Sequence, residues 1–468
     1  MDAPPPVAKT LDEANAIIAV LWAEIQMLKR RVQELEAQLK QNSSNSSKPP
    51  SSDPPWVKRR PPEKPSGRKP GGQPGHPGKA RDLLPPDKVS KFVEVQPERC
   101  AGCGAPLDAS SRVHAAVHQV VDLPESAAMV TQYNQWQCRC ERCGGVTQGE
   151  LPPGVPRIPF GPRLMALVGL LSSRFKMSRR DVQSLLSDLY GIDLSLGAVQ
   201  GCCEQVSRAV AAAAEKVASS ITAAPAVHAD ETGWKEKGKR RWLWTATTPD
   251  AEVFRIAEGR GREALDALLP ESFEGKVHSD RWRPYERFGD DRNQICHAHL
   301  RRDFQALIDR GGEAKPIGER LLLGSDRMFR VWHAFERGEI PQDDMARRMR
   351  GVQVHWGRSL SLAMQSADRK TAALGRNLDR RWHALWTFLY YEEVEPTNND
   401  AERALRRAVL WRKCSFGTQS DDGSRFVERM LTVVGTAKRR SILVFDWLTR
   451  ACQAFVSNEP APLLVAAH

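Results

Sequence analysis

A series of strand-like segments in the middle of the chain constrains the fold more than any other feature. The first segment runs from apolar residues to Asp230 and Glu231 and is followed at once by a turn glycine, Gly233, which predicts a hairpin. The second is rich in aromatic and β-branched residues, as strands are. The segments comprise residues 226–230, 241–248, 252–257, 275–280 and 294–297. A helix is predicted after the third segment and a short one after the fourth.

This order of elements is that of a ribonuclease H-like sheet. In such a sheet the first and fourth strands are neighbours, so Asp230 and Asp280 could meet and share a metal ion. Glu231 competes with Asp230, but side chains alternate along a strand, so only one of them can face the site. Taken alone, an Asp-Glu-x-Gly segment is more often a hairpin turn, and the case for a metal site depends on other acids converging there.

A third carboxylate is expected from a helix late in the chain. Glu402, Leu405 and Val409 are spaced i, i+3 and i+7, which places the carboxylate on the apolar stripe that faces the sheet. The alternative is a surface glutamate paired with Arg406 one turn later. His297 and His299 follow the fifth strand and could border the site, although packing histidines are the more common case.

Helical segments flank and interrupt the sheet. One of them has a helix–turn–helix outline in which Gln200 and Arg208 could face a DNA groove, but many helical hairpins share that outline. The predicted boundaries are 160–220 for this DNA-binding segment, 224–299 and 396–450 for the ribonuclease H-like domain, 300–395 for an inserted helical domain and 451–468 for a C-terminal tail.

Residues 11–40 have the heptad pattern of a coiled coil. Position a is occupied by Leu11, Ile18, Ile25, Val32 and Leu39, and position d by Ala14, Leu21, Leu28 and Leu35. Aliphatic, largely β-branched residues at a with leucine at most d positions favour a parallel dimer. The alternative is a helix that packs on its own protein, because Ile17 and Trp22 add apolar surface beside the seam.

Residues 41–89 are predicted to form a disordered, basic linker rich in proline, glycine and serine. Its cations include Lys58, Arg59 and Arg60, which could bind phosphates by counterion release without reading a sequence. A linker that only solubilises the chain would have the same composition.

Residues 90–150 contain two Cys-x-x-Cys units, each followed by glycine. Cys100 with Cys103, and Cys140 with Cys143, match the knuckles of a zinc ribbon, in which a tight turn points two thiolates at one ion. Four thiolates would hold a structural Zn²⁺ and contribute on the order of 10 kcal/mol to folding. Cys138 is a rival ligand, and unpaired core thiols are the alternative.

Composition points to an anionic partner. The 468 residues include 69 lysines and arginines against 57 acids, a net charge of +12, which favours nucleic acid as a partner. Ten cysteines with no signal peptide in view predict a reducing compartment. We therefore expect an intracellular protein with no membrane segment and a multidomain α+β fold.

Several motifs in one order resemble those of the transposases of the insertion sequence 66 family, which belong to the DDE group. They are residues 71–76, the paired Cys-x-x-Cys units, and residues 228–234, 279–285, 296–302, 398–406 and 412–417. This chain has Cys414 where family members often have another residue. The resemblance covers nearly the whole chain and implies that Asp230, Asp280 and Glu402 are the catalytic acids.

That resemblance implies a Mg²⁺-dependent (or Mn²⁺-dependent) enzyme that cleaves and joins DNA, in the cytoplasm of a bacterium and associated with its nucleoid. Its partners would be double-stranded DNA, as element terminal repeats and target, and further copies of the chain, with accessory proteins of the same element as additional candidates. The alternatives are a DNA-binding regulator without catalysis and a ribonuclease H-like nuclease that joins nothing. The candidate DNA contacts are Lys58, Arg59, Arg60, Gln200, Arg403, Arg406, Arg407, Arg412 and Lys413.

Overall fold

The computed structural model describes residues 8–39, 41–42, 45–46, 82–108, 114, 116–124 and 128–465. Contacts divide the chain into two units, Met1–Val57 with Val130–His468 and Lys58–Met129. The predicted phosphate contacts Lys58, Arg59 and Arg60 lie outside the described residues, as does most of the predicted linker.

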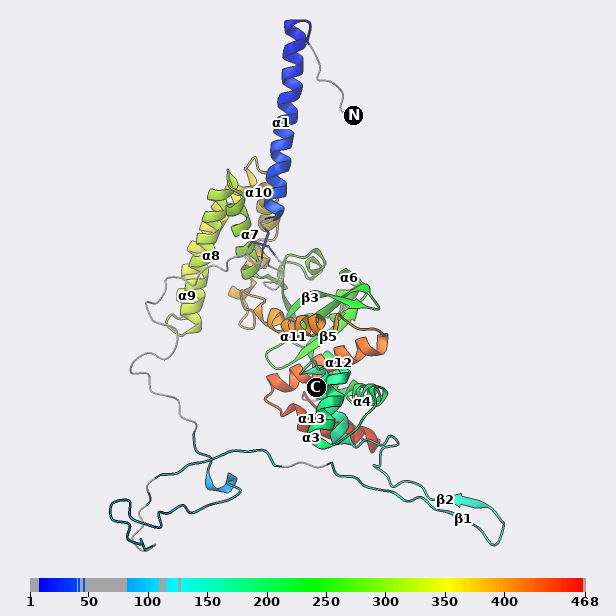
Figure 1. The fold of residues 1–468 in the computed structure, drawn as a ribbon. Helices are drawn as coiled ribbons and strands as arrows, with labels where there is room; N and C mark the ends of the chain where they lie inside the picture. The colour runs from blue at the N-terminus through cyan, green and yellow to red at the C-terminus, as the bar shows by residue number, and fades with distance from the viewer. Residues whose placement is uncertain are drawn as a thin grey trace. The chain divides into compact units, whose positions relative to one another are not determined.

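A mixed sheet forms the centre of the larger unit (Figure 1). Its strands are β3 (Ala226–Glu236), β4 (Lys239–Thr247), β5 (Glu252–Ala257), β6 (Lys276–Ser279) and β7 (Asn293–Ile295). They lie in the order β5-β4-β3-β6-β7, with β3 and β5 antiparallel to β4 and with β6 parallel to both β3 and β7. The prediction that the first and fourth strands are neighbours is confirmed. His228 pairs with His278, so Asp230 and Asp280 each follow two residues after the paired positions.

The first hairpin does not turn at Gly233. β3 continues through that glycine to Glu236, and the turn is made by Lys237 and Gly238, whose φ angles are 49° and 74°. Two consecutive left-handed residues are the geometry of the tight turn that matches strand twist. Asp230 therefore lies inside a long strand, and its interpretation as a hairpin-capping acid is wrong.

Helices from both ends of the chain pack around this sheet in one apolar core. α11 packs on β3 and β4, α12 and α5 pack on β5, and α2 packs on α4 and α13. Their bounds are α2 Pro162–Ser173, α3 Arg179–Tyr190, α4 Leu196–Ala209, α5 Ala211–Thr222, α6 Arg262–Leu268, α11 Asn399–Ser415, α12 Asp421–Arg439 and α13 Val444–Val456. The segment 160–220 thus shares its core with C-terminal helices instead of forming a core of its own.

The region between β7 and α11 has a second apolar core, which includes Phe304, Trp332, Trp356 and Trp386. Its helices are α7 His297–Arg310, α8 Ala314–Glu336, α9 Gln342–Met364 and α10 Arg369–Arg380, followed by short turns η5 His383–Leu385 and η6 Thr387–Leu389.

The C-terminal region is more ordered than predicted. α13 runs through the predicted boundary at residue 451, and Leu464 and Val465 are buried in the main core. Residues 451–465 are therefore part of the folded unit and do not form a separate tail. Among the described residues, none of the helices is long and apolar enough to cross a membrane.

The N-terminal heptads form α1, Leu11–Leu39. Residues at both seam positions expose much of their surface, for example Ile18 at a (62%) and Leu28 at d (59%). A helix of this length follows from the strong helix-forming residues of the segment, and dimerisation through it stays a prediction.

Candidate active site

The three acids singled out by the sequence come together beside β3. Asp230 lies in β3, Asp280 follows β6 directly, and Glu402 lies in the first turn of α11. The start of α11 is held in place by Asn398, whose backbone N–H donates to Cys296 Sγ (3.1 Å) and whose side chain donates to the carbonyl of Ala229 (2.8 Å). Asp230 interacts electrostatically with both Asp280 and Glu402. Asp280 and Glu402 therefore both lie close enough to act on Asp230, although among the described residues the oxygens of the three acids are not all within 4.8 Å of one another.

Asp230 is the centre of this group. Burial, together with the negative charges of Glu231, Asp280 and Glu402, holds the pKa of Asp230 well above its usual range. Its Oδ1 accepts the backbone N–H of Glu231 at 2.9 Å. In the described part of the chain no arginine or lysine forms an ion pair with it. A carboxylate in such surroundings favours either a proton or a bound cation.

Replacing Asp230 with asparagine is expected to stabilise the metal-free protein at pH 7. The raised pKa means that the folded state binds the proton more tightly than the unfolded chain does. The stability from this group is therefore lost as pH rises from the unfolded value of 3.8 through the folded pKa. A neutral amide removes that cost, so urea unfolding in a chelator should show a gain of about 0.5–2 kcal/mol at pH 7.

The gain should disappear below the unfolded pKa, where the wild-type carboxyl is protonated in both states. Mg²⁺ should raise the stability of the wild type more than that of the variant. Asp250→Asn, a change at an exposed turn acid, serves as the control. A variant less stable than the wild type at pH 7 would show that Asp230 is not an electrostatically strained carboxylate.

Glu231, the neighbour of Asp230 in β3, has hydrogen-bond partners of its own. Its carboxylate is buried, accepts a bond from Arg260 (2.6 Å) and accepts another from the Tyr285 hydroxyl (2.8 Å). Burial and Asp280 raise the pKa of Glu231, against the lowering effect of Arg260 and Tyr285. The carboxylate of Glu231 is therefore held inside the protein by Arg260 and Tyr285 and does not face solvent.

Asp280 is oriented by its own loop. Its Oδ1 accepts the backbone N–H of Trp282 at 2.7 Å, and Arg260 lies 3.8 Å from its Oδ2. Arg281 turns away from it and bonds to Asp303 and Asn377 on the helical insertion. Burial raises the pKa of Asp280, although the Trp282 N–H and the charge of Arg260 lower it in part. The loop therefore fixes Oδ1 of Asp280 and leaves Oδ2 facing the guanidinium of Arg260.

Glu402 contacts the start of α7 and not the next turn of its own helix. His299 Nδ1 lies 3.5 Å from Oε1, and Arg302 lies 3.4 Å from Oε2. The alternative pairing with Arg406 is therefore wrong, since Arg406 is on the exposed side of α11. Burial and the charges of Arg302 and Arg281 lower the pKa of His299 to about 3, so its ring is neutral at pH 7.

The two histidines after the fifth strand have different roles. His297 is a packing histidine, as expected, because it lies among Trp356, Trp386 and Phe388 and bonds to the carbonyl of Leu385. His299 borders the acid group, which is the less common role that the sequence left open.

Arg260 is the residue that the sequence analysis missed. Its guanidinium lies between the rings of Trp242 and Trp282, 5.0 and 4.2 Å from their centroids, and reaches both Glu231 and Asp280. The local signal is a single arginine between two glycines, Gly259 and Gly261. Nothing in that signal indicates which carboxylates it meets, because they come from β3 and from the loop after β6.

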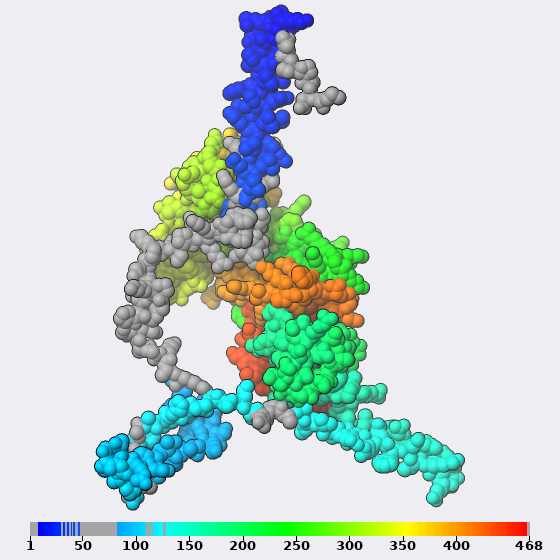
Figure 2. All heavy atoms as spheres, in the orientation of Figure 1, coloured from blue at the N-terminus to red at the C-terminus, as the bar shows by residue number. Residues whose placement is uncertain are grey.

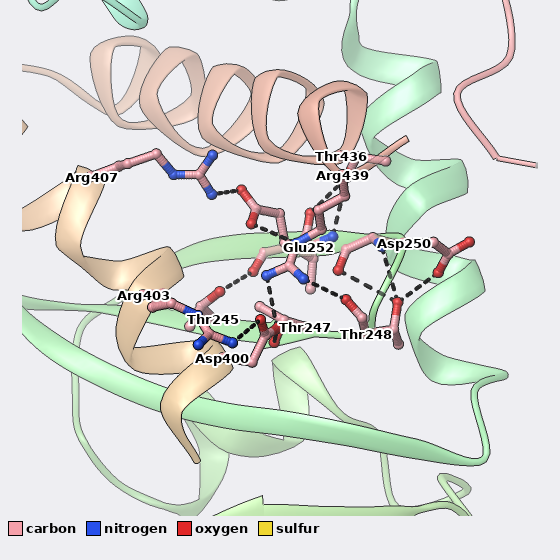
Figure 3. Close-up of polar contacts among 12 residues, drawn as sticks. Thr245, Thr247, Thr248, Asp250, Glu252, Asp400, Arg403, Arg407, Thr436 and Arg439 are labelled. Carbon is pink, nitrogen blue, oxygen red and sulfur yellow. Dashed lines mark hydrogen bonds and ion pairs between the residues drawn. The ribbon is translucent and has the colours of Figure 1, made fainter. Parts of the chain in front are cut away.

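A buried network anchors α11 against the sheet (Figure 3). Glu252 at the start of β5 forms ion pairs with Arg407 of α11 and Arg439 of α12. Arg439 continues to Asp400 at 2.8 Å, and Asp400 accepts a bond from Thr247 of β4 at 2.6 Å. Position 435 in α12 is a glycine that lies against Glu252, and a Cβ there would overlap the Glu252 carboxylate. Asp400 is two residues before Glu402, so the network also positions that acid.

The cations predicted to contact DNA fall into two groups. Arg403, Arg406 and Lys413 are exposed on the outer side of α11, which forms part of the molecular surface (Figure 2, orange). Arg407 instead pairs with Glu252, and Arg412 donates to the carbonyl of Gly233 in β3. The last two therefore hold the helix to the sheet.

Gln200 is not on a free surface. Its side-chain oxygen accepts bonds from Arg179, and its nitrogen donates to Glu204 at 3.0 Å. α4 is packed by α2, α3, α12 and α13, and of the predicted pair only Arg208 is exposed. Ser178 caps α3 and Ser195 caps α4, but α4 is a central packing helix and is poorly placed to enter a DNA groove.

A basic hollow that sequence reasoning did not find lies beside α12. It measures about 180 Å³, and its lining includes Arg174, Lys176, Arg407 and Lys438 with the rings of Phe175 and Trp411. Burial and the charges of Arg407 and Arg174 lower the pKa of Lys438. In the sequence, Arg174 and Lys176 of this hollow are far from Arg407 and Lys438, so no short stretch of sequence contains the cluster.

The two Cys-x-x-Cys units adopt matching turns in different units of the chain. Gly104 donates to the carbonyl of Cys100 (2.9 Å) and Gly144 to that of Cys140 (2.8 Å), with φ angles of 74° and 72°. Backbone N–H groups of the second cysteine and of the residue before it lower the pKa of Cys100 and of Cys140. Cys103 and Cys143 are exposed, so these thiols are not core residues. Binding of one ion by all four stays a prediction.

Comparison with known proteins gives the following similarities. The Transposase IS66 family matches residues 157–425, which is more than half of the chain. A family of unknown function (DUF6444) matches residues 3–82. The uncharacterized protein y4hP of Sinorhizobium fredii (strain NBRC 101917 / NGR234) is 24% identical over 402 residues, and the match covers 78% of this chain and 72% of that protein. The uncharacterized protein y4qI of the same organism is 25% identical over 248 residues, and the match covers 48% of this chain and 46% of that protein.

Proposed function

The chain belongs to the Transposase IS66 family, and from that premise we propose that it is a DDE transposase that cleaves and joins DNA at the ends of a mobile element. The observation that carries the proposal is that Asp280, from the loop after β6, and Glu402, from α11, both act electrostatically on Asp230 of β3. The raised pKa of Asp230 supports it, because carboxylates that repel one another favour a shared cation.

The residues present fit a magnesium site. The three acids offer only oxygen ligands, which Mg²⁺ and Mn²⁺ prefer. Two such ions would activate the attacking oxygen and stabilise the leaving oxygen of an in-line phosphoryl transfer. The chain itself holds Asp280 through the Trp282 N–H, holds the start of α11 through Asn398, and moderates the local charge with Arg260 and Arg302.

The sheet supports a ribonuclease H-like catalytic domain. Its first three strands are consecutive and antiparallel, and the fourth and fifth are parallel to the first on the other side, in the order β5-β4-β3-β6-β7. In this arrangement the first strand is central, so acids on it, on its parallel neighbour and on a helix packed across it can meet.

The exposed side of α11 is the proposed contact for DNA phosphates. Replacing both Arg406 and Lys413 with alanine is expected to weaken DNA binding by a similar factor for all sequences. Each lost phosphate contact should lower the slope of log affinity against log salt by about 1, so the double variant should lose about 2. Arg347→Ala, at an exposed arginine of α9, is the control. An unchanged slope would exclude α11 from the interface.

We further propose that α1 joins two copies of the chain as a parallel coiled coil and that the four knuckle cysteines hold a structural Zn²⁺. The exposed seam of α1 and the matching turns at Cys100 and Cys140 support these assignments. Element terminal repeats, target DNA and accessory proteins of the same element are the proposed further partners.

The experiment that tests the function uses the full chain, DNA carrying the ends of its own element, a target plasmid and Mg²⁺. Cleavage at the ends followed by their covalent joining to target is the expected result. Cleavage without joining would instead support a nuclease. End binding without metal-dependent cleavage would support a DNA-binding regulator.

A further inference from the structure

A second set of metal-ligand side chains lies where α7 meets α11. Cys296 Sγ, a ring nitrogen of His299 and a carboxylate oxygen of Glu402 all lie within 4.8 Å of one another. Cys296 and His299 come from the start of α7, and Glu402 comes from the first turn of α11. A thiol, an imidazole and a carboxylate within this distance form a different donor set from the all-oxygen magnesium site.

Two of these groups have polar atoms that the protein leaves unsatisfied. His299 Nδ1 and Glu402 Oε1 are both buried, and among the described residues neither has a hydrogen-bond partner, although they lie 3.5 Å apart. An unsatisfied buried polar atom costs about 1–3 kcal/mol, and most such atoms in native proteins have a partner. A cation between the two would satisfy both atoms. Arg302 contacts only Oε2 of the carboxylate, so Oε1 is available.

The third group is held in place by the backbone. Cys296 is the residue that begins α7, and its sulfur accepts the backbone N–H of Asn398 at 3.1 Å. Outer hydrogen bonds of this kind orient a metal ligand before the ion arrives. His299 follows three residues later, so both ligands lie on the side of the first turn that faces α11.

The chemistry of the three donors selects zinc among common divalent ions. Zn²⁺ binds thiolate at roughly 2.3 Å and imidazole nitrogen or carboxylate oxygen at roughly 2.0–2.2 Å. Thiolate and imidazole are poor ligands for Mg²⁺ and good ones for Zn²⁺. Side-chain rotations that move each donor atom by about 1 Å would bring the three atoms to these distances from a Zn²⁺ ion, with a fourth position left for water.

We propose that Cys296, His299 and Glu402 form a Zn²⁺ site that withdraws Glu402 from the magnesium centre and so inhibits the enzyme. Binding replaces the thiol proton of Cys296 with the metal, and the proton leaves to solvent. Inhibition rests on the proposed function, because it requires Glu402 to act in cleavage. Zn²⁺ binding itself does not depend on that function.

Binding is tested with Co²⁺ as a spectroscopic substitute for Zn²⁺ in the full chain. The protein is purified with zinc, treated with a mild chelator and titrated with Co²⁺ while thiolate-to-metal charge-transfer absorption is recorded. The wild type should gain one equivalent of thiolate-bound Co²⁺. Cys296→Ser should abolish this signal, and His299→Ala should weaken the affinity at least about tenfold. Cys452→Ser, at another buried cysteine, should leave it intact.

Absorption that survives Cys296→Ser would overturn the site, as would its loss in Cys452→Ser. Circular dichroism and thermal unfolding are recorded for each variant. If Cys296→Ser fails to fold, the test depends on His299→Ala, which changes a side chain at the edge of the core. This variant should still bind Co²⁺ at least about tenfold more weakly than the wild type.

Inhibition is tested by end cleavage in Mg²⁺ with added Zn²⁺, with each rate divided by the rate of the same variant without zinc. His299→Ala should need at least about tenfold more Zn²⁺ for half inhibition than the wild type. Equal sensitivity would overturn the inhibitory role. A wild type that binds Co²⁺ through Cys296 but cleaves nothing would refute the transposase and leave the metal site standing, so the two failures are distinct.

Discussion

Asp280→Asn is expected to reduce Mg²⁺-dependent cleavage of element ends by at least about a thousandfold, the loss typical when a main electrostatic stabiliser of a phosphoryl transfer is removed. Asparagine has the same shape as aspartate and can keep the bond that Trp282 N–H now makes to Oδ1 at 2.7 Å. The variant should therefore fold normally and lose only the charge that would bind the metal. Single-turnover cleavage of labelled end DNA measures the effect.

Two controls separate this loss from indirect effects. Affinity for end DNA, measured without metal, should change less than about threefold, because the substitution removes a negative charge and touches none of the exposed cations. Asp250→Asn, at a turn acid paired with Arg440, should cleave at the wild-type rate. Cleavage by Asp280→Asn within tenfold of wild type would remove Asp280 from the proposed catalytic set.

Much of the sheet could be predicted because its signals are local. Short β-branched and aromatic runs, separated by helical segments, specify strand number and connection type, and connection type restricts which strands can be neighbours. Asp230 and Asp280 are each two residues past the paired histidines of adjacent parallel strands, so a correct strand order brought both acids to one place. The inward position of Glu402 followed from helical spacing in the same way.

What the sequence did not reveal depends on partners that are distant in the chain. Gly233 looked like a turn residue, but β3 continues past it because Arg412 of α11 bonds to its carbonyl and Thr418 bonds to Lys235. Arg407 and Arg412 looked like surface cations for the same reason, since their partners lie far away in sequence. Gln200 looked like a groove contact because the sequence does not show that the distant helices α12 and α13 also pack against α4.

The family assignment and the fold agree, but they support different statements. The match over residues 157–425 covers the sheet, the insertion and α11, which carry the three acids. It does not cover α1 or the cysteine turns. The coiled-coil and zinc proposals therefore depend on local geometry and on their own experiments, whereas the catalytic proposal draws on both the family and the site.

Glu252→Ala is expected to lower the free energy of unfolding by about 3–5 kcal/mol, the cost of removing one partner from a buried ion pair. Glu252 is 1% exposed and neutralises two arginines from different helices, Arg407 and Arg439. Without it the half-buried Arg407 loses its acidic partner and Arg439 keeps only Asp400. The space left by the carboxylate also adds a cavity next to Gly435. Urea unfolding followed by tryptophan fluorescence measures the change.

The matched control is Glu258→Ala, just after the same strand, where the side chain is 85% exposed and pairs with Arg241 at 3.0 Å. Exposed pairs contribute about 0–1 kcal/mol, so this change should be nearly neutral. Equal destabilisation by both variants would show that the network does not anchor α11.

Glu252→Ala should also slow cleavage at temperatures where the variant is still folded, because Asp400 belongs to the network and lies two residues before Glu402. A folded variant with wild-type cleavage would mean that Asn398 and Arg412 keep α11 and Glu402 in place without the network.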